Sequence, residues 1–167
     1  YPIATFSGSS RTQINQPAGC SSGGDFMMQQ NFPSSAWGKR YLLAPSSLSG
    51  AANTLAINIW RIAVKDPTTV VKRNGTTLTG LINNQYYQIN GAIGEYIEAD
   101  KPITVAQFLT GGTCGGSGVG DPEMIYISPI EQGIKKVGFY RNNRESITVN
   151  YLTMIVPTNG IGSLKIT

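Results

Sequence analysis

The chain has 167 residues, of which 40% are hydrophobic and only 13% charged, and its net charge is +4. This length predicts a single domain spanning residues 1–167, and it permits burial of roughly 70% of the unfolded surface without help from metals. The basic residues are scattered in runs of no more than two, which argues against nucleic-acid binding. No apolar stretch reaches the length of about 18 residues that a membrane span needs, so none is expected.

Apolar and polar residues alternate along most of the chain, and this period of two predicts strands. Asn74-Gly75 is flanked by β-forming residues and predicts a two-residue hairpin turn. Asp100-Lys101-Pro102 predicts a second turn. Strands are expected at Tyr1–Phe6, Lys39–Ala44, Leu55–Lys65, Thr69–Lys72, Thr76–Leu78, Gln85–Ile89, Gly94–Glu98, Ile103–Leu109, Met124–Ile130, Lys135–Arg141, Ser146–Val156 and, after a turn at Asn159-Gly160, Ser163–Thr167.

This spacing of about ten strands predicts an all-β fold, a β-sandwich of the jelly-roll or immunoglobulin-like kind. Trp60-Arg61-Ile62 interrupts the alternation of its strand, which indicates a bulge or burial on both faces. The Gly-, Ser- and Gln-rich stretch Ser7–Asn31 is expected to be a long irregular loop near the N-terminus.

The two cysteines, Cys20 and Cys114, both lie in loops rich in glycine and serine. The composition is typical of a secreted domain, so a Cys20–Cys114 disulfide is expected, and two unpaired buried thiols are the alternative. Such a bond would close a loop of roughly 94 residues and stabilise the fold by about 4–5 kcal/mol in a chain-entropy model.

The chain contains no histidine, which removes Ser-His-Asp and Cys-His nucleophile systems and most zinc sites. The glycines of 111–120 are not followed by the lysine of a phosphate-binding loop. Asp121 with Glu123 or Glu131 could be named as a glycosidase pair, but no sugar platforms are evident beside them. Asp25, Asp121 and Glu123 are too sparse to name a calcium site. We therefore expect no enzyme, no catalytic or metal-binding residues and no cofactor, with Ca²⁺ as the one ion worth testing.

The segment Gly120–Gln132 (GDPEMIYISPIEQ) gathers three acidic residues after a glycine-rich loop. The structural interpretation is a tight entry into a strand, in which Met124 and Tyr126 share one face and Pro129 marks an edge or a strand end. The functional interpretation is a ligand-binding loop surface tied down by the disulfide. Its candidate ligand-binding residues are Gly115, Ser117, Asp121 and Glu123. Asn74-Gly75-Thr76 also matches a glycosylation sequon, but the hairpin turn alone explains the Asn-Gly pair.

Several phrases appear in a familiar order: ATFSGS (4–9), GDFMMQQNFP (24–33), WGKRYLLAP (37–45), WRIAVKDPTTVVKRNG (60–75), YIEADKPITVAQFLTGG (96–112), VGDPEMIYISPIEQ (119–132) and ITVNYLTMIVPT (147–158). In this order they resemble the IgGFc-binding protein N-terminal domain family, over nearly the whole chain. Members commonly carry a cysteine soon after the FSG motif, which is absent here. The family unit also continues beyond SLKIT, so the chain is expected to be an excised part of a larger protein.

The resemblance implies a secreted or cell-surface protein, and the animal namesake of the family is credited with binding the Fc part of immunoglobulin G. No Fc-contacting motif can be transferred to residues of this chain. A non-enzymatic extracellular recognition or adhesion module is expected, with a glycoprotein, a mucin-type glycan or a protein as ligand. The alternative is a structural subunit, in which copies assemble into a layer, stalk or filament by pairing of strand edges.

Overall fold

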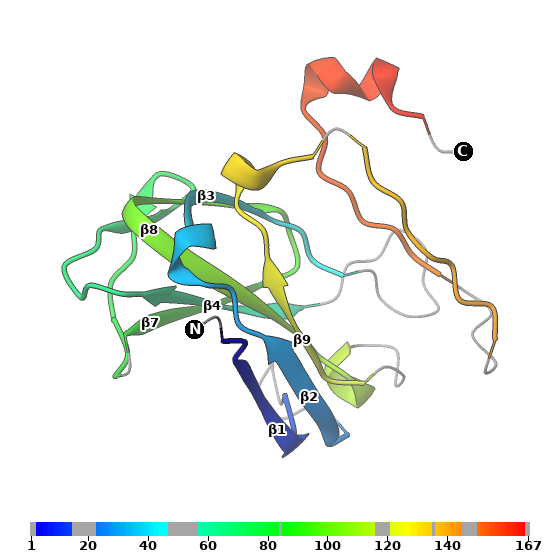
Figure 1. Cartoon of the computed structure of the whole chain (residues 1–167), viewed down its shortest axis with the longest axis horizontal. Helices are drawn as coiled ribbons and strands as arrows, with labels where there is room; N and C mark the ends of the chain where they lie inside the picture. Colours follow the sequence, from blue (N-terminus) through cyan, green and yellow to red (C-terminus); the bar gives the residue numbers. More distant parts are fainter. Residues whose placement is uncertain are drawn as a thin grey trace.

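The computed structural model describes residues 3–14, 23–46, 57–83, 85–115, 121–134, 136–144 and 150–165. Within these ranges the chain is built from antiparallel strands and short 3-10 helices (Figure 1), so the prediction of an all-β fold is confirmed. The strands are β1 (Phe6–Thr12), β2 (Asp25–Gln30), β3 (Gly38–Leu43), β4 (Asn58–Val64), β5 (Val71–Arg73), β6 (Thr76–Thr77), β7 (Tyr86–Gly91), β8 (Glu95–Leu109) and β9 (Glu123–Ile127). The 3-10 helices are η1 (Ser34–Ala36), η2 (Gly112–Gly115), η3 (Ile130–Gln132) and η4 (Thr158–Ser163).

Seven strands form one sheet in the order β6-β5-β8-β4-β7, and β3 and β9 also pair with β8. β1 and β2 form a separate two-stranded sheet. The predicted sandwich of about ten strands is therefore not confirmed. In the described part of the chain, the large sheet encloses one core by itself and shares a second core with the β1–β2 hairpin.

β8 is the central strand of the large sheet. It runs unbroken through Asp100-Lys101-Pro102, so the turn predicted at these residues is wrong. Its first half pairs with β3 and β5, and its second half pairs with β4 and β9. Pro102 falls between the residues paired with β5 and those paired with β4. Its missing N–H therefore breaks no bond of either ladder, and the strand continues.

β4 contributes side chains to two separate cores. Trp60 and Ile62 are fully buried in a first core with side chains from β3, β5, β7 and β8, whereas Ile59 joins a second core with Phe108 and Met124. The pairing of β4 with β7 and β8 shows no register shift, so burial on both faces, and not a bulge, explains the irregular pattern.

The β1–β2 hairpin contributes Met27 of β2 and Ile14, just beyond β1, to this second core. Its position corrects the prediction that Ser7–Asn31 is one irregular loop, because two strands lie within that stretch. The strands are rich in glycine, serine and glutamine, which concealed them, but they pair with each other over Phe6–Thr12. Residues 15–22 lie outside the described part of the chain.

The Asn74-Gly75 turn is confirmed, with positive φ angles of 49° and 84° at its two residues. The Asn74 side chain is also used within the fold. Its amide donates to the Glu95 carboxylate, and its oxygen accepts from the backbone N–H of Tyr96 at 2.8 Å. These bonds fix the β5–β6 hairpin to the start of β8.

The C-terminal strand predictions are wrong for the residues that can be tested. Residues 136–144 and 150–157 lie outside any strand, and 158–163 form η4 in place of the approach to a last strand. Asn159-Gly160, where a turn into that strand is predicted, instead lie inside η4. An alternating pattern forms a strand only beside a partner, and no described residue of these segments is paired with one.

Candidate functional site: two pockets beside the middle of β8

The middle of β8 brings together charged side chains from three segments of the chain. Asp100 and Lys101 follow each other on β8, at the point where its pairing changes from β5 to β4. The chain that joins β4 to β5 therefore passes beside them. Asp66 lies at the beginning of this connection, directly before Pro67.

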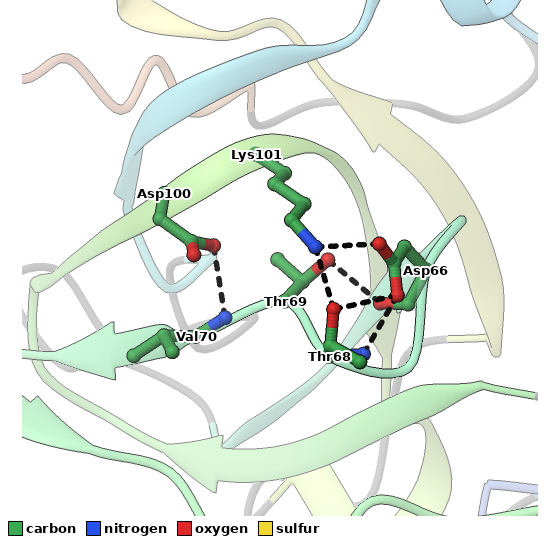
Figure 2. A network of polar contacts seen from close by, with 6 residues as sticks. All are labelled: Asp66, Thr68, Thr69, Val70, Asp100 and Lys101. Atoms are coloured by element: carbon green, nitrogen blue, oxygen red, sulfur yellow. Dashed lines mark hydrogen bonds and ion pairs between the residues drawn. The ribbon is translucent and has the colours of Figure 1, made fainter.

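Figure 2 shows the resulting polar network. The Asp66 carboxylate accepts from the backbone N–H and the hydroxyl of Thr68, both at 2.8 Å, which is the local turn that aspartate favours. Lys101 Nζ donates to the second Asp66 oxygen and, at 2.6 Å, to Thr68 Oγ1. Asp100 accepts from the backbone N–H of Val70 at 2.9 Å, so both ends of the connection are held to β8.

These contacts control the charge of Asp66. The hydrogen bond from Lys101, followed by those from Thr68, lowers the pKa of the Asp66 carboxyl to about 2. The carboxylate is therefore ionised and paired at neutral pH. It can accept hydrogen bonds from a ligand, but it cannot serve as a general acid there.

Beside this network lies a pocket of about 470 Å³, which we call the Trp37 pocket. The half-buried indole of Trp37 forms part of its wall, and its orientation is held by a hydrogen bond from Nε1 to the carbonyl of Phe32 at 3.3 Å. Lys65 also faces the pocket, and it makes no ion pair within the described residues. The lining comprises Ser34, Trp37, Lys65, Asp66, Thr69, Lys101 and Pro102.

A second pocket of about 560 Å³, the Arg40 pocket, lies next to the first half of β8. Its charges are largely compensated within the protein. Arg40 Nε contacts Glu131 Oε1 at 3.0 Å, and Lys72 Nζ lies 3.8 Å from Glu98 Oε1. Burial acts to raise the pKa of Glu131, but hydrogen bonds, including the one from Arg40, outweigh it and the pKa is lowered. The lining comprises Lys39, Arg40, Val70, Lys72, Glu98, Ala99, Asp100 and Glu131.

The residues that the sequence singled out lie elsewhere. Cys114 is buried in η2, and Asp121 and Glu123 are exposed before and at the start of β9. Gly115 ends η2, whereas Cys20 and Ser117 lie outside the described residues, so the disulfide and the loop surface stay predictions. Within β9, Met124 and Tyr126 share one face as predicted, and Pro129 lies just beyond the strand end.

Trp37, Asp66 and Lys101 were not recognised as site residues from the sequence. Asp66-Pro67-Thr68 carries the signal of an aspartate-led turn, and it could have been found. Nothing in the sequence shows that Lys101 and Trp37 meet this turn, because the three residues come from separate segments. In the described ranges, no group of three or more metal-ligating side chains gathers.

The family profile described as IgGFc binding protein matches residues 1–167, the whole chain. The chain belongs to the IgGFc-binding family. This membership confirms the resemblance seen in the sequence and identifies the chain as a binding module. No curated protein and no solved structure matches it. Among the described residues of this family member, no helix is long and apolar enough to span a membrane.

Proposed function

We propose that this chain is a non-enzymatic, extracellular recognition or adhesion module that binds a glycoprotein, with a sugar residue held in the Trp37 pocket. The observation that supports this proposal is an aromatic wall beside converging hydrogen-bonding groups in one pocket. Ligand pockets combine an apolar surface with a few well-placed polar groups in this way. Sugars present C–H faces to an indole ring and hydroxyls to hydrogen-bonding side chains.

The charge of the pocket favours an acidic sugar. Lys65 and Lys101 supply two positive charges, and Asp66 supplies one negative charge. Lys101 is engaged by Asp66, whereas Lys65 has no ion pair within the described residues. A sugar carboxylate or sulfate would give Lys65 its partner, as on the acidic glycans of mucin-type glycoproteins.

The test is binding of the full chain to immobilised sialylated mucin and to the same mucin after desialylation. Replacement Trp37→Ala should lower the affinity about tenfold, because loss of ring contacts costs roughly 1.4 kcal/mol. Phe26→Ala is the matched control, since Phe26 is an exposed aromatic residue outside the pocket. Equal binding by the two variants, or no preference for sialylated mucin, would refute the assignment of the pocket.

The loops around Gly115, Ser117, Asp121 and Glu123 are the second candidate surface for the same function, with a Cys20–Cys114 disulfide holding them. Replacing Asp121 and Glu123 by Ala together tests this surface in the same assay. A loss of mucin binding there, with Trp37→Ala unaffected, would move the site from the pocket to the loops.

A structural subunit is the alternative function, supported by the sheet edge at β7. Within the described residues, β4 is the one strand that pairs with β7, and beyond a single bridge from Tyr86 to Ile82 the other edge of β7 can pair with another chain. Light scattering across a concentration series tests this. Growth in mass with concentration would favour assembly over a monomeric binding module.

A further inference from the structure

The last part of the chain, here called the C-terminal arm, comprises residue 134 and residues 136–144 and 150–165. Figure 1 shows its yellow, orange and red segments leaving the large sheet beyond η3. Its two extended segments meet through a hydrogen bond from Asn150 Nδ2 to the carbonyl of Asn142 at 3.0 Å. No described residue of the arm lies in a strand.

The arm exposes large apolar side chains to an unusual degree. Tyr140 is 81% exposed and Ile134 is 71% exposed, and the others range from 42% to 66%. An exposed apolar surface of this kind marks an interaction site. Besides Tyr140 and Ile134, the exposed apolar residues of the arm are Val137, Phe139, Tyr151, Leu152, Met154, Ile155, Ile161 and Leu164.

Residues 133–167, which include the C-terminal arm, carry the net charge of the protein. Residues 1–132 contain eight basic and eight acidic residues, so their net charge is zero. Residues 133–167 contain five basic residues and one acidic residue, which gives the entire +4. A partner for this surface should therefore be acidic as well as apolar.

The backbone and the side chains of the arm select the class of partner. Lipid is disfavoured, because extended backbone outside any ladder leaves polar groups that hydrocarbon cannot satisfy. A glycan chain offers little to the exposed Ile, Val, Leu and Met side chains. A second copy brings another arm of the same charge and a body without net charge. A polypeptide in extended form can cover the side chains and pair with the backbone at once.

We propose that the C-terminal arm binds an extended, acidic and apolar polypeptide segment of another protein, which adds a strand along the arm. A small pocket of about 260 Å³ between the two arm segments supplies an anchoring point. It places an aromatic wall beside a guanidinium, the residue types that dominate binding at protein interfaces. Its lining comprises Phe139, Tyr140, Arg141, Asn150, Tyr151 and Leu152.

The test uses the full chain and a fluorescein-labelled peptide of alternating Glu and Val, followed by fluorescence anisotropy. The peptide should bind, and the Kd should rise at least about fivefold between 50 mM and 500 mM salt. The double replacement Arg141→Gln/Arg144→Gln should raise the Kd at least about fivefold, and Phe139→Ser should do the same. The matched control, Arg11→Gln/Arg61→Gln, removes two exposed arginines that lie outside the arm and outside all three pockets, and it should change the Kd less than about twofold.

Two further probes decide between classes of partner. A Glu-Val peptide that is N-methylated at alternate residues cannot donate ladder hydrogen bonds and should lose binding. Equal binding of the methylated peptide, or tighter binding to phosphatidylserine vesicles or to heparin, would overturn the proposal. So would failure of the Glu-Val peptide to bind, or arm-dependent self-association in light scattering. Binding should survive Trp37→Ala, so the outcome is independent of the sugar pocket.

Discussion

The ion pair between Arg73 and Glu95 should be strongly asymmetric in its response to mutation. The Glu95 side chain is only 1% exposed, whereas that of Arg73 is 33% exposed, and the Glu95 carboxylate also accepts from Asn74. Arg73→Met removes the cation and leaves a buried carboxylate with the Asn74 amide as its remaining partner. Glu95→Gln instead leaves a partly solvated cation and keeps a side chain that can hydrogen-bond.

The magnitude follows from this difference in exposure. Removing one partner of a buried ion pair costs about 3–5 kcal/mol, and the bond from Asn74 places Arg73→Met near 3 kcal/mol. This corresponds to a fall in Tm of roughly 6–12 °C for a chain of this size. Glu95→Gln should cost only about 1 kcal/mol, because Arg73 can turn toward water. Urea unfolding followed by circular dichroism measures both values.

The pH dependence supplies a second and sharper test. In the wild type, the hydrogen bond from Arg73 lowers the pKa of Glu95 from its ordinary value of 4.5 despite burial. The stabilisation is therefore present above pH 4.5 and is lost as the pH falls through the lowered value. In Arg73→Met, burial should raise the pKa of Glu95, so the penalty should shrink as the pH falls from 7 towards 4.5. Parallel stability curves for the two proteins, or a larger cost for Glu95→Gln, would refute this reasoning. Arg40→Met at the exposed pair with Glu131 is the control and should change little.

Three other substitutions test the fold around the pockets. Asp66→Asn should reduce the loss of stability between pH 4 and pH 2, because the pKa of Asp66 is about 2 and its stabilisation is lost as the pH falls through that value. Acid unfolding measures this loss. The same loss in the variant and the wild type would refute the hydrogen bond from Lys101 to Asp66. Asn58→Leu should lower the free energy of unfolding by about 2–3 kcal/mol in urea unfolding. The fully buried Asn58 side chain hydrogen-bonds with Ser46 and accepts from Gln107 Nε2, which would lose this acceptor. An unchanged stability would show that these groups find other partners. Gly38→Ala should lower Tm and loosen η3, because an added Cβ would overlap Pro129, whereas Gly138→Ala, where the space is open, should not.

The sequence predicted those elements whose signals are local. The turn at Asn74-Gly75 requires positive φ angles that this pair adopts readily, and the strand around Trp60 and Ile62 is long and apolar. The all-β class followed from the same alternation. Family membership also came from the sequence, because the phrases that carry it are contiguous.

The errors arose where a distant partner decides the structure. Asp100-Lys101-Pro102 has turn chemistry, but pairing on both sides of β8 holds it extended. Ser7–Thr12 is polar and flexible in composition, and β2 makes it a strand. The C-terminal segments alternate well but have no strand beside them in the described residues. The Trp37 pocket could not be predicted, because it exists only where three distant segments meet on β8.

Because β8 pairs with four other strands, the large sheet should unfold as one cooperative unit. β3, β4, β5 and β9 each use β8 as their neighbour, so none of these ladders can open at β8 without exposing the first core or the second. Amide hydrogen exchange along β8 should therefore need global unfolding, while β6 and β7, at the edges, exchange through local opening. A chain cut between Glu98 and Thr104 should accordingly lose both halves of the sheet in a single cooperative step, and not one half at a time.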